Sequence, residues 1–111
     1  MALPRKNRLK GKKDFDYIFK NGNTAKGRFL LVKYVKLALK DPRIGFIVPV
    51  RVARRAVDRN RTKRILANNI QKDLSKINKD AVVLVLRLPP KESETGTLSQ
   101  ELNKLIPNLY E

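Results

Sequence analysis

The sequence predicts a small single-domain protein of the α/β (α+β) class, in which helices pack on one mixed sheet. Two observations support this. The chain has 111 residues, a length that suits one domain. Its apolar residues also switch between the 3.6-residue period of helices and the two-residue period of strands, in the order α-β-β-α-β-α. The prediction treats residues 1–111 as one domain, without internal repeats.

The first part of the chain combines a basic arm with a short helix. Residues 1–13 carry six basic residues and no acid, together with Pro4 and Gly11, so we expect a flexible arm. Residues 14–21 follow as a helix, because Phe15, Ile18 and Phe19 fall on one helical face. Gly22 is the expected stop signal.

Three segments have the pattern of strands. Residues 28–37 alternate between two faces, with Phe29, Leu31 and Lys33 on the same side. After a turn at 40–42, residues 43–50 form a second strand, and Pro49 places it at an edge or an end. Residues 80–88 are almost continuously apolar, as in a central strand covered on both faces.

Two further helices complete the predicted fold. The longer one begins at Arg54 or Asp58 and ends at residue 77. Its inward stripe consists of Thr62, Leu66, Ile70, Leu74 and Ile77. Residues 91–96 form a polar loop, and residues 97–106 form the last helix, in which Thr97 and Gln100 have the spacing of a capping box.

The charge of the chain favours a polyanionic partner. The net charge is +16 and the pI is about 10.6. Residues 1–91 hold 25 basic and 6 acidic residues, so the excess belongs to the folded body and the arm. Nucleic acid relieves such self-repulsion best. A membrane partner lacks support, because the sequence has no long apolar run and no basic amphipathic helix with large exposed hydrophobic residues.

The residue types argue against catalysis by the protein itself. The absence of Cys and His excludes disulfides, zinc knuckles, thiol nucleophiles and imidazole chemistry. The acids before residue 92 are scattered, and Asp14, Asp58 and Asp80 stand where helix caps or turn residues are expected. We therefore expect no catalytic residue and no metal site. No secretory signal is visible, so a cytoplasmic location is expected.

Residues 51–64, RVARRAVDRNRTKR, form the densest basic block. Half of these residues are basic, and six of the seven are arginine, whose planar guanidinium matches phosphate oxygens two at a time. On a helical wheel Arg61, Arg64 and Asn68 point away from the apolar stripe. A solvated charged face is the ordinary explanation for such residues. The density of arginine and the scarcity of acids favour an RNA-binding surface instead.

Phe15 and Phe19 allow two interpretations. They are either core residues or a platform on which the bases of single-stranded RNA stack. The basic residues of the arm, including Lys12 and Lys13, would then hold the phosphates.

Three stretches together resemble the bacterial ribonuclease P protein component: NRLKGKKDFDYIFKNG (7–22), RFLLVKY (28–34) and RIGFIVPVRVARRAVDRNRTKR (43–64). The resemblance covers residues 7 to about 90. Arg59-Asn60-Arg61 followed by Lys63-Arg64 matches the signature of the family.

The resemblance implies a specific function. In that family a catalytic RNA removes the 5′ leader of precursor tRNA, and the protein binds both this RNA and the single-stranded leader. The implied RNA-contacting residues are Arg51, Arg54, Arg55, Arg59, Asn60, Arg61, Lys63 and Arg64. The implied leader cleft contains Lys12, Lys13, Phe15, Phe19, Phe29, Leu31 and Lys33. The implied cofactor is Mg²⁺, bound mainly by the RNA subunit and the substrate. The implied fold has an unusual left-handed β-α-β crossover.

The chain departs from the family pattern at several positions. Pro49, Val50 and Ala53 stand where the family often has Ser, Lys and Gly, and Ala67 replaces a frequent basic residue. Contacts around residues 49–53 and 67 therefore stay open, and Arg54 and Arg55 are available to compensate.

A structural RNA-binding protein, such as a small ribosomal protein, is the alternative that the residues leave open. It shares the charge, the size and the lack of catalytic residues. It would not need Phe15 and Phe19 on an open face.

Overall fold

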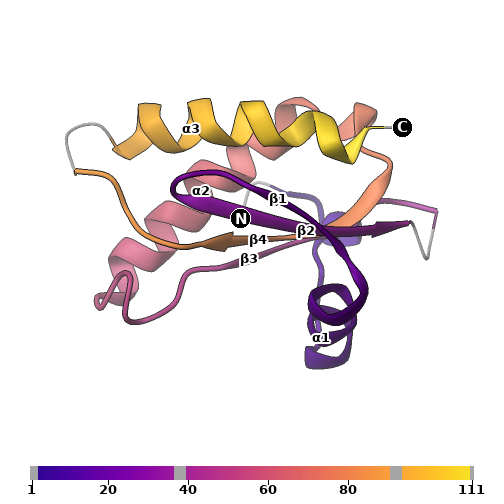
Figure 1. Cartoon of the computed structure of the whole chain (residues 1–111), viewed down its shortest axis with the longest axis horizontal. Helices are drawn as coiled ribbons and strands as arrows, with labels where there is room; N and C mark the ends of the chain where they lie inside the picture. Colours follow the sequence, from indigo (N-terminus) through magenta and orange to yellow (C-terminus); the bar gives the residue numbers. More distant parts are fainter. Residues whose placement is uncertain (1–2, 37–39, 91–93, 111) are drawn as a thin grey trace.

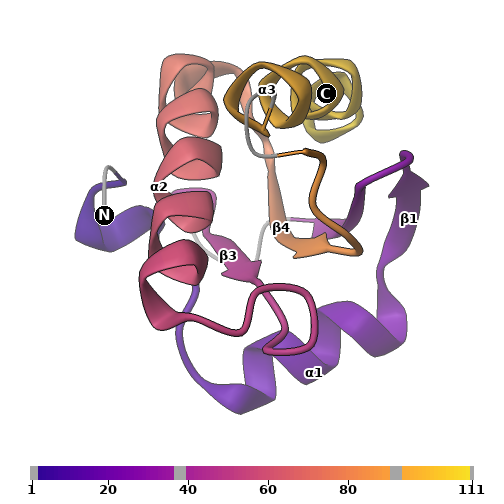
Figure 2. The same cartoon turned by 90° about the vertical axis from the view of Figure 1, so that its left-hand side faces the viewer.

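The computed structural model describes residues 3–36, 40–90 and 94–110. Helices α2 (Ala56–Lys72) and α3 (Glu94–Leu105) cover one face of a four-stranded sheet, and α1 (Lys12–Asn21) lies against the opposite face. Figure 1 shows these three layers from the side, and Figure 2 shows them along the strands.

The sheet is mixed, as predicted. Its strands are β1 (Asn23–Lys26), β2 (Leu30–Lys36), β3 (Ile44–Ile47) and β4 (Lys79–Val85), in the spatial order β1-β2-β4-β3. Strand β3 is parallel to β4, and the other pairs are antiparallel. The predicted element order is confirmed, with β1 as an additional short strand. The sequence of β1, NTAK, has no apolar alternation, so only its pairing with β2 makes it a strand.

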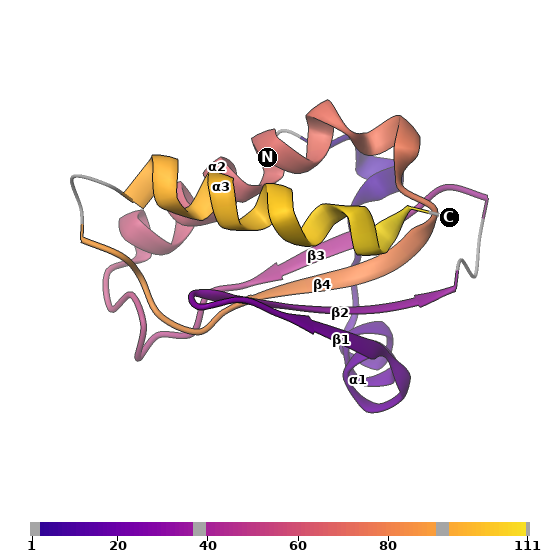
Figure 3. The same ribbon diagram turned by 45° about the horizontal axis from the view of Figure 1, so that its top comes forward.

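The crossover from β3 through α2 to β4 is left-handed. Figure 3 views the sheet from the side of α2 and α3. If this view is turned so that the parallel strands β3 and β4 point upward, β4 lies to the left of β3. Nearly all β-α-β units have the opposite hand. The fold that the resemblance implied is therefore present.

The core is centred on β4, which lies between β2 and β3. Ala81, Val83 and Val85 are fully buried in the cluster that contains Leu66 and Leu102 of the helices. Val82 is fully buried in a second, smaller cluster on the side of α1. Both faces of β4 are therefore covered, as its apolar run predicted.

Several predicted boundaries are wrong by a few residues. Helix α2 ends at Lys72, and Leu74–Lys76 form a separate 3₁₀ turn. The strand predicted over 43–50 ends at Ile47, two residues before Pro49. Strand β2 begins at Leu30, and the predicted end at residue 37 lies outside the described residues.

The last helix starts earlier than predicted. Helix α3 begins at Glu94, so residues 94–96, predicted as loop, are helical. Thr97 therefore lies inside the helix and cannot be its N-cap, and the predicted capping box is wrong. The rest of the predicted loop, residues 91–93, lies outside the described residues.

The N-terminal arm is packed against the domain from Leu3 onward, which corrects the expectation of a flexible arm. Leu3 is fully buried in the main core. The backbone N–H of Leu9 donates to the carbonyl of Ile44 at 3.1 Å, and Arg8 forms an isolated parallel bridge with Ile44. The buried Asn7 side chain donates to the carbonyl of Pro42 at 2.8 Å. The arm thus runs along β3, one of the two edge strands of the sheet.

Candidate RNA-binding surfaces

The first candidate surface surrounds the start of α2, and we call it the arginine surface. It comprises the sequence-predicted set Arg51, Arg54, Arg55, Arg59, Asn60, Arg61, Lys63 and Arg64. Arg51, Arg54, Arg55, Asn60 and Arg64 are exposed, whereas Arg59, Arg61 and Lys63 are half-buried. Arg51, Arg54 and Arg55 precede α2, and the other five residues lie in its first half.

Arg59 has a structural task that the sequence did not indicate. Its Nη1 donates hydrogen bonds of 2.9 Å to the carbonyls of both Ala53 and Arg54. One guanidinium thus holds the loop that enters α2. Arg55 is the N-cap residue and makes no side-chain cap bond. The loop that carries Arg54 and Arg55 is therefore fixed from within the helix.

The helical wheel correctly predicted the inner face of α2. Thr62, Leu66 and Ile70 are buried, and Arg64 and Asn68 are exposed. Arg61 differs from the prediction: it is half-buried and lines a pocket beside the segment that follows β4.

Two departures from the family pattern have structural counterparts. Ala67 is fully buried in the main core and Ala53 is nearly so. A long basic side chain at position 67 would have to leave this core, so the alanine suits its surroundings. Val50, in contrast, is 62% exposed.

The second candidate surface lies on the opposite side of the sheet, and we call it the aromatic surface. Its members are Phe15 and Phe19 of α1 with Leu31 and Lys33 of β2, all half-buried. Both phenylalanines pack against the small cluster of Leu9, Ile18 and Val82, and each keeps part of its side chain accessible. Core packing and an accessible face therefore coexist in these residues.

Phe15 depends on a glycine in the neighbouring strand. A Cβ atom at Gly45 would lie 2.5 Å from Cζ and 2.6 Å from Cε1 of Phe15. The phenyl ring therefore occupies the space that a side chain on β3 would fill. Gly22 is needed for a similar reason, because its Cβ would lie 2.5 Å from the carbonyl oxygen of Ile18. The helix stops there as predicted, although Gly22 has a φ of −78°.

Phe29 does not join the aromatic surface, which corrects the predicted strand face. It precedes β2 and packs against the main core, with the guanidinium of Arg28 5.4 Å from its ring centroid. A Glu101 carboxylate oxygen accepts the backbone N–H of Phe29 at 2.7 Å, and Leu86 donates to its carbonyl at 2.8 Å. These bonds hold Phe29 toward α3.

Lys12 and Lys13 are exposed in the first turn of α1. Positive charges at a helix N-terminus oppose the helix dipole, by roughly 0.3–1 kcal/mol each. A phosphate bound there would offset this repulsion, because its negative charge attracts both the lysines and the N-terminus of the helix. Their position therefore fits an anion-binding role beside Phe15.

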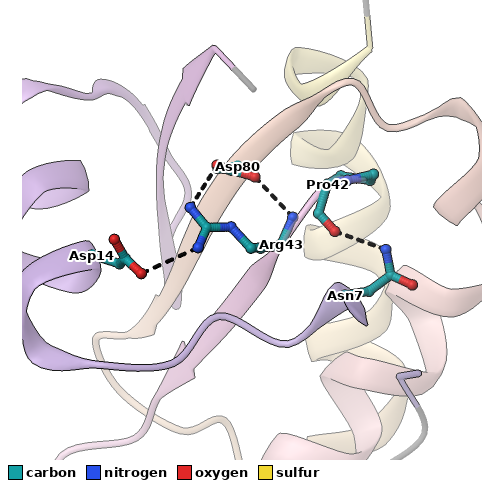
Figure 4. A network of polar contacts seen from close by, with 5 residues as sticks. All are labelled: Asn7, Asp14, Pro42, Arg43 and Asp80. Carbon is teal, nitrogen blue, oxygen red and sulfur yellow. Dashed lines mark hydrogen bonds and ion pairs between the residues drawn. The ribbon is translucent and has the colours of Figure 1, made fainter. Parts of the chain in front are cut away.

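An ion-pair network attaches α1 to the sheet (Figure 4). Arg43 pairs with Asp14 of α1 and with Asp80 of β4, each at 3.2 Å. The backbone N–H of Arg43 also donates to Asp80 Oδ1 at 2.9 Å. Asp80 was predicted as a cap or turn residue, but it lies buried within β4. The sequence signal for this role was the position of Asp80 directly before an apolar run, where a buried carboxylate needs a basic partner.

The other acids form no recognisable metal site. Among residues 3–36, 40–90 and 94–110, no group of three or more His, Cys, Asp or Glu side chains could hold a metal ion. Within the same ranges, no helix has the length and apolar character needed to cross a membrane.

Comparisons with known proteins show which family this chain resembles. Residues 3–110 match the family model described as Ribonuclease P. A ribonuclease P protein component from Prochlorococcus marinus is 33% identical over 123 residues, covering 96% of this chain and 95% of that protein. One from Syntrophomonas wolfei is 36% identical over 86 residues, covering 77% and 71%. The solved RNase P protein of Staphylococcus aureus superposes with a TM-score of 0.82 at 28% identity, covering 95% of this chain and 98% of the other.

Proposed function

The chain belongs to the ribonuclease P protein family, and from this membership we propose that it is the protein subunit of the ribonucleoprotein that removes the 5′ leader of precursor tRNA. The observation that carries the proposal is the family match over nearly the whole chain, together with two separate surfaces that suit RNA. The family match also favours this function over that of a purely structural RNA-binding protein.

The arginine surface is proposed to bind the RNA subunit. Exposed guanidinium groups on a helix start and on a loop fixed by Arg59 offer rigid, bidentate partners for phosphates. Rigid presentation lowers the entropy that is lost when the complex forms.

The aromatic surface is proposed to bind the single-stranded leader. Phe15 and Phe19 offer accessible ring area beside Lys33 of β2, and Lys12 and Lys13 lie at the start of the same helix. Stacking is worth roughly 1–3 kcal/mol per base and tolerates any base, which suits leaders of varied sequence.

Hydrolysis is proposed to belong to the RNA subunit, with Mg²⁺ held by that RNA and by the substrate. The described residues offer no cluster of acids for the ion. The protein would assist at low Mg²⁺ because its basic residues neutralise phosphates that otherwise need metal ions. We place this activity in the cytoplasm, in keeping with a chain that has no cysteine.

Reconstitution tests the proposal directly. The protein would be added to its cognate RNA subunit and precursor tRNA over a series of Mg²⁺ concentrations. We expect faster leader removal at low Mg²⁺ and no cleavage by the protein alone. Unchanged cleavage at every Mg²⁺ concentration would contradict the proposal.

A further inference from the structure

A pocket of about 430 Å³ opens within the arginine surface. It lies between the loop before α2, the first turns of α2 and the segment after β4. Val52, Leu88 and Pro89 supply apolar walls. Its size falls within the range of small-molecule sites, so one planar ring system fits inside it.

The polar lining of this pocket combines both signs of charge. Arg54, Arg55 and Arg61 stand around it, and Asp58 supplies the one acid of residues 51–64. The exposed guanidinium groups of Arg54 and Arg55 suit the phosphates of a nucleotide. The apolar walls suit the faces of a base, and neither element distinguishes one base from another.

Asp58 is the distinguishing group. It is half-buried, and within the described part of the chain its carboxylate takes part in no ion pair. Its backbone is engaged twice: the carbonyl accepts from Thr62 Oγ1 at 2.8 Å, and the N–H donates to the carbonyl of Arg55 at 3.1 Å. A carboxylate is acceptor-only, so two oxygens are available for donors on a ligand.

We propose that this pocket binds one unpaired guanine of a single-stranded stretch of RNA, with Asp58 accepting hydrogen bonds from the base. The Watson–Crick edge of guanine carries the N1–H and the N2 amino group side by side, which match the two carboxylate oxygens. Adenine, cytosine and uracil each place an acceptor beside their donor and would repel one of these oxygens. The inference rests on the proposed RNA-binding function and adds base selectivity to it.

The ordinary role of Asp58 makes a different prediction. An acid in the first turn of a helix stabilises the helix by roughly 0.3–1 kcal/mol, because its charge interacts favourably with the helix dipole. That role would affect stability equally whichever RNA is present. Base selectivity therefore separates the two roles.

The test compares 12-residue oligouridine RNAs that carry one central guanosine, adenosine or inosine, with affinity measured by fluorescence anisotropy. We expect the wild-type protein to prefer the guanosine RNA over the adenosine RNA by about tenfold, as for other bidentate base contacts. Inosine lacks the N2 amino group and should lose most of this preference. The inosine arm uses the unaltered protein, so it does not depend on the folding of any variant.

Asp58→Asn should reduce the guanosine preference below about twofold, because one acceptor becomes a donor. Asp73→Asn is the matched control, since it removes one acid from the other end of α2 and should leave the preference intact. Thermal melting checks that both variants fold.

The outcomes distinguish this inference from the proposed function. Equal affinity for the guanosine and adenosine RNAs, or a guanosine preference that persists in Asp58→Asn, overturns the guanine site alone. Failure to bind any of the RNAs, together with unchanged cleavage on reconstitution, overturns the proposed function as well.

Discussion

The two faces of the sheet are covered to different degrees. On the side of α2 and α3, Leu30, Val32 and Val83 are completely buried under the helices. On the side of α1, Leu31, Leu84 and Ile47 are only half-buried, as are Phe15 and Phe19 of α1. The first face is sealed, and the second leaves apolar area accessible to a ligand.

This difference separates stability from binding. Burying apolar area contributes roughly 25 cal/mol per Å², so most of the folding energy comes from the sealed face. Residues on the other face can change with less effect on the fold. With a net charge of +16, the basic binding residues repel one another and destabilise the free protein. The sealed face has to supply the stability that offsets this repulsion.

The largest expected effect is on the sealed face. Leu66→Ala should lower the free energy of unfolding by about 3–5 kcal/mol, because Leu66 is fully buried in the main core. Leu31→Ala, on the other face, should cost about 1 kcal/mol, since its side chain is half-buried. Urea unfolding measures both, and equal losses would contradict the comparison.

The next effect concerns the two partners of Arg43. Asp80 is 1% exposed and Asp14 is 45% exposed. Asp80→Asn should cost about 2 kcal/mol of stability because a buried charge-assisted hydrogen bond is lost. Asp14→Asn should cost less than about 1 kcal/mol, as for other solvent-exposed pairs. The comparison uses unfolding curves at one ionic strength.

Binding to the leader is expected to depend on the aromatic surface. Phe19→Ala should weaken affinity for a single-stranded leader by about 1–3 kcal/mol through the loss of one stack. Tyr17→Ala is the matched control, because Tyr17 is 59% exposed on the same helix but does not belong to the cluster under Phe15 and Phe19. Equal losses in the two variants would show that any aromatic residue of α1 serves.

The smallest effect concerns single arginines. Arg64→Gln should reduce the slope of log affinity against log salt by about 0.7, the value for one phosphate on a single strand. Lys72→Gln, at the opposite end of α2, should leave the slope unchanged. Titrations at several salt concentrations measure the slope. An unchanged slope in Arg64→Gln would exclude this residue from phosphate contact.

The local pattern was sufficient for most of the helices and strands. The apolar run after Lys79 predicted a central strand, and the stripe through Leu66 and Ile70 predicted the inner face of α2. These predictions hold because periodicity is a property of the chain alone. Strand β1 and the role of Arg59 were not predicted, because both depend on partners that the local pattern does not contain.

The sequence by itself determined the charge, the element order and the residues that could bind RNA, because composition and period are local. Only the tertiary structure decided how those residues are grouped. It left Phe29 on the α3 side through its bonds to Glu101 and Leu86, and it placed Phe15 over Gly45. It also brought Leu88 and Pro89 beside Asp58 to form a pocket. Such groupings arise from contacts between residues 30 or more positions apart, which no local pattern specifies.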